Sequence, residues 1–165
     1  MIERIVSGGQ TGVDQAALSI AKELDIPFGG WCPKGGLDEN GVCVLNAYPS
    51  LIEATTSDPD ERTKLNIRDS DGTLVIVPCI PLPERIQDGT RLTITDAERQ
   101  GKPHIIISLA EKDAAVSQIR EWISREKIQV LNVAGPRESN SPGIYLNAYE
   151  LFQELLADLR PALRI

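Results

Sequence analysis

Three short polar loops that contain glycine follow segments with the composition of buried strands. They read SGGQTG (7–12), ERIQDGT (84–90) and GPRESNSPG (135–143). Glycine lets a backbone turn tightly and approach a ligand closely, and a helix that starts after such a turn presents free N–H groups to an anion. The loops are therefore candidate binding sites for a small anionic ligand, such as a phosphate group.

The first loop has two interpretations that the sequence leaves open. Gly8 and Gly9 would form the tight turn, and Gly12 with the following helix start would direct backbone N–H groups at the anion. Thr11 and Asp14 also have the spacing of a capping pair, in which side chains satisfy the start of the helix. The loop is then a structural turn before a capped helix.

The other two loops add hydroxyl groups and a cation. Gly89 and Thr90 lie before an expected helix start and form a second candidate anion site, although hydroxyls at helix starts are often caps. Arg137 carries a guanidinium group suited to bidentate recognition of a phosphate or another oxyanion. A surface ion pair between Arg137 and Glu138 is the alternative.

The common nucleotide-binding motifs are not present in these loops. Ser7 stands where a G-x-G-x-x-G fingerprint needs its first glycine, and no acidic residue marks the end of the expected second strand. A Walker A loop needs Gly-Lys-Ser/Thr, and the first loop has no lysine. The sequence therefore indicates neither NAD binding nor ATP hydrolysis.

The region 27–57 is irregular and rich in glycine and proline, and after the expected second strand at 26–31 it forms a long excursion. Its length suggests a functional excursion. Within it Lys34 could fold over the site, and Trp31 could stack on a planar ring or belong to the core. His104 follows Pro103 at the start of an expected strand, so we interpret it as structural.

The elements that position these loops alternate along the chain. ERIVS, GTLVIVP, PHIIISL and IQVLNVAG are nearly continuous apolar runs, which predict strands covered on both faces. A short strand is expected at 26–31, and helical periodicity covers 13–24, 91–99, 115–123 and 144–159. This order predicts an α/β fold with a doubly wound, mainly parallel sheet flanked by helices, with the loops at its carboxyl edge.

Length and charge restrict the function further. With 165 residues and 41% hydrophobic content, we expect one domain over 1–165. The net charge of −7 disfavours nucleic-acid binding. No long apolar run or signal segment is present, so we expect a soluble, cytoplasmic protein without membrane contact.

The cysteines do not have the spacing of a metal or disulfide framework. Cys32, Cys43 and Cys79 are an odd number, and a single histidine accompanies them. We expect free thiols and no metal site made by the protein, although a soft thiolate would suit a metal that arrives with a ligand.

Four ordered motifs give the chain a family resemblance: SGGQTGVDQAAL, GGWCPKGG, RTKLNIRDSDGTLVI and LNVAGPRESNSPGIY. They resemble the molybdenum cofactor carrier family, through nearly the whole chain. This family is a branch of a Rossmann-like superfamily that also holds the cytokinin-activating phosphoribohydrolases and the "lysine decarboxylase-like" proteins. The resemblance implies a Rossmann-like fold and a pocket for molybdopterin with its terminal phosphate, and it implies molybdoenzymes as partners that receive the cofactor.

The resemblance also implies a set of ligand-binding residues, carried over by motif position. They are Gly8, Gly9, Gln10, Thr11, Gly12, Lys34, Arg62, Thr63, Ser70, Asp71, Gly72, Gly89, Thr90, Gly135, Arg137, Glu138 and Ser139.

One departure from the phosphoribohydrolase relatives bears on catalysis. Their P-G-G-x-G-T-x-x-E loop supplies a glutamate, whereas RIQDGTRLT has Thr93 at that position. Asp96, Glu98 or Glu138 would have to replace it as the group that activates water. We therefore expect a binding protein or carrier.

Two alternatives to a carrier stay open. One is an enzyme that acts on nucleoside monophosphates, with Asp14, Asp71 or Glu138 as general base. The other is a nucleotide-sensing module. The apolar last helix, with Leu151, Phe152 and Leu155, fits a homo-oligomer interface and packing on the sheet equally well.

Overall fold

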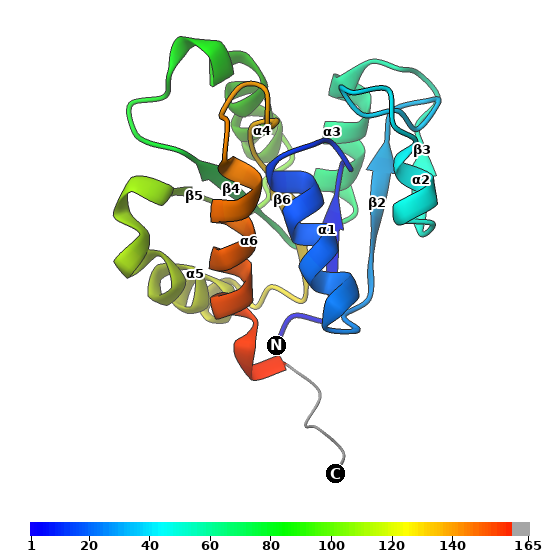
Figure 1. The fold of residues 1–165 in the computed structure, drawn as a ribbon. Coiled ribbons are helices and arrows are strands. Elements are labelled where there is room, and N and C mark those ends of the chain that lie inside the picture. The colour runs from blue at the N-terminus through cyan, green and yellow to red at the C-terminus, as the bar shows by residue number, and fades with distance from the viewer. Residues whose placement is uncertain (160–165) are drawn as a thin grey trace.

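The structure is a computed structural model, and it describes residues 1–159. Strands and helices alternate along the chain (Figure 1). In order, the elements are β1 (Arg4–Ser7), α1 (Val13–Glu23), β2 (Phe28–Cys32), α2 (Val44–Ala47), β3 (Leu51–Glu53), α3 (Pro59–Arg68), β4 (Gly72–Val77), η1 (Glu84–Ile86), α4 (Gln87–Arg99), β5 (His104–Ser108), η2 (Leu109–Glu111), α5 (Lys112–Glu126), β6 (Val130–Ala134), α6 (Ile144–Leu155) and η3 (Ala157–Leu159).

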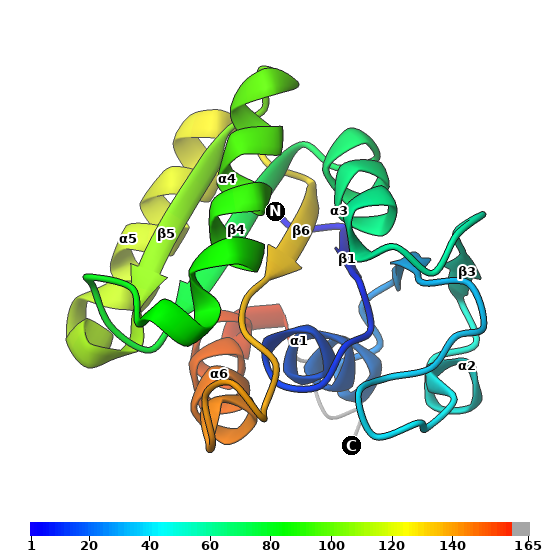
Figure 2. The same ribbon diagram turned by 90° about the horizontal axis from the view of Figure 1, so that it is seen from above.

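The strands form one parallel sheet in the order β3-β2-β1-β6-β4-β5. Helices α1, α5 and α6 cover one face, and α3 and α4 cover the other (Figures 1 and 2). Every residue of β4 is buried, as the continuous apolar run GTLVIV predicts for a strand between two helical layers. The expected α/β Rossmann-like fold is confirmed.

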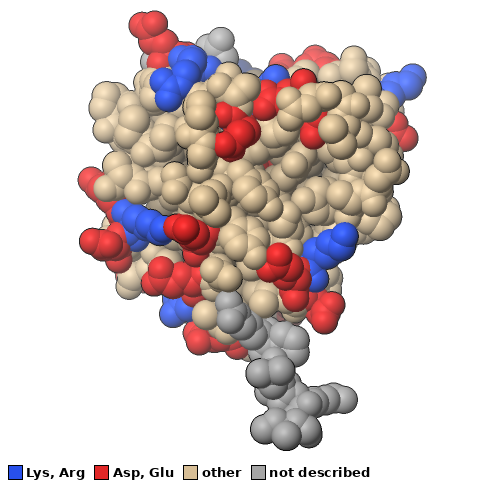
Figure 3. Space-filling model, in the orientation of Figure 1, with Lys and Arg blue, Asp and Glu red and all other residues tan. Residues whose placement is uncertain are grey.

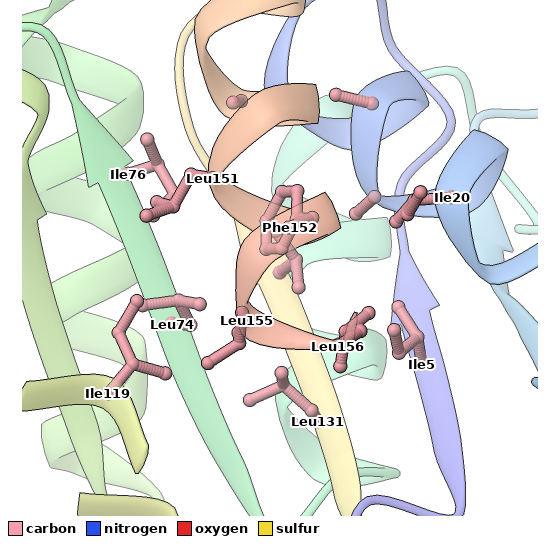
Figure 4. Close-up of a cluster of buried hydrophobic side chains, with 14 of the residues drawn as sticks. Ile5, Ile20, Leu74, Ile76, Ile119, Leu131, Leu151, Phe152, Leu155 and Leu156 are labelled. Carbon is pink, nitrogen blue, oxygen red and sulfur yellow. The ribbon is translucent and has the colours of Figure 1, made fainter. Parts of the chain in front are cut away.

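The main core lies between the sheet and the α1, α5 and α6 layer (Figure 4). Leu151, Phe152 and Leu155 of α6 point at the sheet beside Leu74 and Leu131. Full burial of a side chain of this kind is worth about 1.5 to 3 kcal/mol, so this layer fixes α6 against the sheet. The expected apolar faces of α5 and α6 are confirmed, and the side chain of Leu159 lies outside the described part.

Two element boundaries differ from those that the sequence predicts. Helix α4 begins at Gln87 instead of residue 91, so Gly89 and Thr90 lie in its first turn. The N–H of a glycine in the first turn of a helix needs no intrahelical partner, which explains why the helix begins before Gly89 and not after it. Strand β2 begins at Phe28 instead of residue 26. The carbonyl of Pro27, directly before it, accepts a hydrogen bond from the Ile5 N–H at 2.9 Å.

The part of the irregular segment between β2 and α2 contains a small hairpin, which we name the strap (residues 36–43). Leu37 and Cys43 form an antiparallel bridge, and the Asp38 N–H donates to the Val42 carbonyl at 2.9 Å. The strap projects from the same end of the sheet as the loops that follow β1 and β6 (Figure 2).

Charges are dispersed over the face formed by α1, α5 and α6. In Figure 3 the Lys and Arg side chains of this face lie singly among Asp and Glu, mostly near its margins. Within residues 1–159, no helix has the length and apolar character needed to cross a membrane.

Candidate functional site

A pocket opens at the carboxyl edge of the sheet between α3 and α4, the edge seen in Figure 2. Its volume of about 300 Å³ is at the lower end of the range for small-molecule sites. All three predicted loops contribute to it. Of the predicted binding residues, those that line the pocket are Gln10, Arg62, Thr63, Gly89, Thr90, Gly135 and Arg137.

Three arginines from three elements line the pocket. Arg62 comes from α3, Arg85 from η1 and Arg137 from the loop after β6. Arg85 was not predicted as a binding residue, although it lies in the second quoted loop, and its Nε donates to the Asn140 carbonyl. Guanidinium groups in a concave site are suited to binding phosphate, because each offers several donors together with a positive charge.

Arg62 forms an ion pair with Asp14 in the wall of the pocket. The Nη1 of Arg62 lies 3.3 Å from the Oδ2 of Asp14, and both side chains are largely buried. Burial raises the pKa of Asp14 above its ordinary value, and the charge of Arg62 offsets part of that rise. The Nε of Arg62 is buried and has no hydrogen-bond partner among the described residues, so the guanidinium has an unused donor beside the pocket.

Gly8 is needed because Arg62 occupies the space beside it. A Cβ at residue 8 would lie 1.6 Å from the Nη1 of Arg62 and 2.9 Å from the Oδ2 of Asp14. The absence of a side chain at residue 8 therefore leaves room for the ion pair between Arg62 and Asp14.

The start of α1 is satisfied by the protein itself, although not as a capping pair of Thr11 and Asp14. Helix α1 has Gly12 at its N-cap and no side-chain cap bond. The Gln10 N–H donates to Asp14 at 3.2 Å. Gly12 has φ 79°, and a Cβ there would lie 2.4 Å from the Pro136 carbonyl oxygen. The turn is thus packed against the loop that follows β6.

A second polar cluster lies next to the turn, and it centres on a residue that the sequence did not indicate. Glu39, in the strap, accepts hydrogen bonds from the Thr11 hydroxyl at 2.5 Å and the Ser139 N–H at 3.1 Å, and a further one from the Ser139 hydroxyl. Gln10 joins the cluster, since its Oε1 accepts from the N–H groups of Glu39 and Thr11 at 2.7 and 3.1 Å. We name this cluster the Glu39 clasp.

The hydrogen bonds of the clasp change the acidity of Glu39. Partial burial acts to raise the pKa, but hydrogen bonds from Ser139 and Thr11 and the charge of Arg137 outweigh it, and the pKa is lowered. Glu39 is therefore held as a carboxylate by two of the predicted loops. No signal in the sequence could have found these contacts, because they join residues 28 and 100 positions apart.

Glu138, a predicted binding residue, has a structural role at the start of α6. Its Oε1 accepts from the Gly143 N–H at 2.5 Å and its Oε2 from the Tyr145 N–H at 2.9 Å. It therefore satisfies the start of α6, where a negative charge is favourable.

Other predicted residues lie away from the pocket lining. Ser70, Asp71 and Gly72 lie at the start of β4, at the opposite edge of the sheet. There the Asp71 carboxylate accepts the N–H groups of Gln129 and Val130 at 2.9 and 2.7 Å. The structure thus does not bring these three residues to the pocket.

Lys34 and Trp31, from the irregular segment 27–57, also lie outside the pocket lining. Lys34 is exposed, and its N–H donates to the Thr56 carbonyl at 2.9 Å. Trp31 donates its Nε1–H to Asp69 at 2.7 Å, and the Arg68 guanidinium lies 6.0 Å from its ring centre. These contacts tie Trp31 to the end of α3.

The carboxylates that could activate water differ in access. Asp96 is buried and one of its oxygens has no partner among the described residues, whereas Glu98 is exposed on α4. Thr93 lines the pocket and donates its hydroxyl to the Gly89 carbonyl at 3.0 Å. Of the acids considered from the sequence, Asp14 is the one in the pocket lining.

Comparison with known proteins gives two similarities that span the pocket. Residues 5–156 match the circularly permutated YpsA SLOG family. The chain is similar to the crystal structure of the "Putative molybdenum carrier protein" from Syntrophus aciditrophicus SB, with 43% identity and a TM-score of 0.86, over 94% of this chain and 95% of that chain. None of the curated proteins matches. The residues matched by the family include all three loops.

Proposed function

Because the chain belongs to the circularly permutated YpsA SLOG family, we propose that it is a carrier that holds a molybdenum-bearing pterin cofactor in the pocket between α3 and α4. The observation that carries this proposal is the convergence of Arg62, Arg85 and Arg137 on one cavity. The name of the Syntrophus protein supports the choice of molybdenum as cargo.

The residues of the pocket fit an anionic organic ligand better than a bare metal cation. Three arginines and two carboxylates, Asp14 and Asp60, line the pocket. Because Arg62 is paired with Asp14, Arg85 and Arg137 leave an excess of positive charge that attracts a phosphate group. The unused Nε donor of Arg62 also lies beside the cavity. A molybdenum atom would enter this site already chelated by the ligand, and the protein would bind the ligand's phosphate and polar edges.

The pocket also offers neutral polar groups for the rest of the ligand. Thr63, Thr90 and Asn140 line it from three different segments, and Gln10 lies beside the turn. Hydroxyl and amide groups bind a heterocycle through hydrogen bonds, which fix its orientation. We therefore assign the phosphate to the arginines and the pterin to the neutral side chains, and we expect the carrier to pass the cofactor to molybdoenzymes.

Mass spectrometry of released small molecules tests this proposal. Wild-type protein purified without oxygen is expected to release a pterin together with molybdenum, and Arg137→Ala is expected to release neither. Arg125→Ala is the matched control, because Arg125 is exposed on α5 and pairs with Glu126 at 3.0 Å. Release of a nucleotide, or equal pterin content in both variants, would contradict the carrier proposal.

A second candidate function is hydrolysis of a nucleoside monophosphate, and the environment of Asp14 favours it. Burial raises the pKa of this pocket carboxyl, which brings it nearer the range useful for proton transfer at neutral pH. In this reaction Asp14 would accept the proton of the attacking water while the arginines hold the phosphate.

Release of free base from a nucleoside monophosphate tests the hydrolase. The enzyme proposal expects turnover that Asp14→Asn abolishes, with Glu98→Gln as a control because that residue is exposed on α4. Turnover that survives Asp14→Asn would sink the role of Asp14 in this reaction. A nucleotide that binds without turnover favours a sensing module.

A further inference from the structure

The Glu39 clasp uses hydrogen-bond donors that a phosphate group would also use. Two hydroxyls and one backbone N–H converge on a single acidic group, from Thr11 and Ser139. Arg137 adds a positive charge close enough to lower the pKa of Glu39. Hydroxyl groups, backbone N–H groups and an arginine are the usual partners of a bound phosphate.

The donors of the clasp are positioned by contacts that do not involve Glu39. The Thr11 oxygen accepts the Glu138 N–H at 3.2 Å, which leaves the Thr11 proton free to point at an acceptor in the clasp. The Ser139 segment is fixed by the turn after Arg137, where the Ser141 N–H donates to the Arg137 carbonyl at 3.2 Å. The donors therefore remain in place if the carboxylate leaves.

The clasp is accessible from solvent. Ser139 is exposed and Glu39 is half-buried, whereas Thr11 is buried behind them, so an ion in solution reaches Ser139 first and reaches the Thr11 hydroxyl only after Glu39 moves away. Removing the carboxylate breaks the side-chain bonds of the strap to Ser139 and Thr11, while the Glu39 N–H still donates to Gln10 at 2.7 Å.

We propose that Thr11 and Ser139 form an oxyanion site that Glu39 fills from within the chain, and that a tetrahedral oxyanion displaces Glu39 and releases the strap. The oxyanion is either a free inorganic ion or the phosphate group of an organic ligand. This site is next to the pocket through Gln10 and Arg137, and the inference does not depend on which ligand the pocket holds.

Titration with inorganic phosphate, followed by the backbone amide signals of 15N-labelled protein, tests the exchange. We expect Glu39→Gln to bind phosphate at least tenfold more tightly than wild type. The neutral amide of glutamine accepts hydrogen bonds from Thr11 and Ser139 more weakly than a carboxylate does, and it does not repel the anion. The signals of Ser139 and Glu138 are expected to shift most. Shifts confined to Gly89 and Thr90 would place the ion in the pocket and overturn the proposal.

Glu53→Gln is the matched control. Glu53 is also an exposed acid near the strap, and its Oε1 accepts the Gly35 N–H at 2.7 Å. The same loss of charge and of one acceptor there is expected to leave phosphate affinity within twofold of wild type. Equal tightening in both variants would show a general charge effect and overturn the proposal.

Removing the donors completes the test. Ser139→Ala in the Glu39→Gln protein is expected to return phosphate affinity to the wild-type level or below, and an unchanged affinity would overturn the proposal. Ribose 5-phosphate is titrated in parallel, because binding of the ester alone identifies an organic ligand and binding of both probes identifies the free ion as sufficient. If neither probe binds at Ser139, the site does not exist.

A measurement on the wild-type protein keeps the proposal falsifiable if the variants fold poorly. Hydrogen exchange of the strap amides 37–42 is expected to accelerate as phosphate is added, because the displaced Glu39 no longer holds the hairpin. Exchange that stays constant up to saturating phosphate would overturn the proposal.

Discussion

The glycine-rich turn 8–12 and the arginine-lined pocket lie side by side, yet they differ in how far the protein satisfies their polar groups. In the turn, carboxylates of the protein itself accept the donors: Asp14 accepts from Gln10, and Glu39 accepts from Thr11. In the pocket, the Nε of Arg62 has no partner among the described residues. Donors in the glycine-rich turn are therefore already bonded within the protein, whereas the neighbouring pocket keeps a donor without a partner.

Substitution of a turn glycine gives the largest expected effect. Gly12→Ala places a Cβ at positive φ and 2.4 Å from the Pro136 carbonyl oxygen, so we expect a loss of about 3 kcal/mol in the free energy of unfolding. Urea denaturation measures it. Gly89→Ala is the control, because a Cβ there meets nothing within 4 Å and alanine favours a helix by up to about 1 kcal/mol. Similar losses in both variants would contradict a structural role of the turn.

Substitution of Arg62 and of Arg137 is expected to affect stability to different extents, although both residues line the pocket. Arg62→Gln removes the ion-pair partner of the buried Asp14, and we expect a stability loss of about 1 to 3 kcal/mol. Arg137 is half-buried, so Arg137→Gln is expected to change stability by less than about 0.5 kcal/mol. Both variants are expected to lose ligand. Denaturation of the ligand-free proteins provides the comparison, and equal stability losses would remove the distinction.

The pH dependence of Asp14→Asn has a defined sign. Burial raises the pKa of Asp14 in the folded protein above 3.8, so the folded state holds a proton that the unfolded state has released. Stability is then lost as pH rises from 3.8 through the raised pKa. We expect Asp14→Asn to gain stability relative to wild type over that range, as measured by urea denaturation at several pH values. A constant difference between the two proteins would refute the raised pKa.

Glu39→Gln is expected to have a small effect on stability, with a pH dependence opposite to that of Asp14→Asn. The pKa of Glu39 is lowered below 4.5, so its stabilising contribution is present above that pH and is lost as pH falls through the lowered pKa. We expect the variant to be less stable than wild type by about 1 kcal/mol at pH 7 and equally stable at strongly acidic pH. A deficit that persists in acid would show that the clasp does not depend on the charge of Glu39.

The sheet and its helical layers could be predicted because burial on both faces leaves a local signal. The runs GTLVIV and HIIIS are mostly apolar, and they form β4, which is buried throughout, and β5, which is buried at its carboxyl end. The start of α4 was wrong because Gly89 indicates a turn when read alone, whereas its place in the first turn of a helix depends on the packing of the neighbouring elements.

The candidate site could be predicted where a loop follows a strand, and not where distant segments pair. Gln10, Gly89 and Arg137 line the pocket at positions that strand ends imply. Glu39 carries no local pattern, because its partners belong to other loops. A circular permutation also changes the order of loops along the chain, so the position of RIQDGTRLT does not identify its counterpart in relatives that are not permuted.

Strand β6 lies between β1 and β4 in the sheet, although it comes last along the chain among the strands of residues 1–159. A nascent chain that has left the ribosome only as far as α5 can pair β1 with β2 and β4 with β5, but its two half-sheets have no strand to join them. The pocket needs residues from both halves and from the loop after β6. The pocket lining is therefore incomplete until β6 and the loop that follows it have been synthesised.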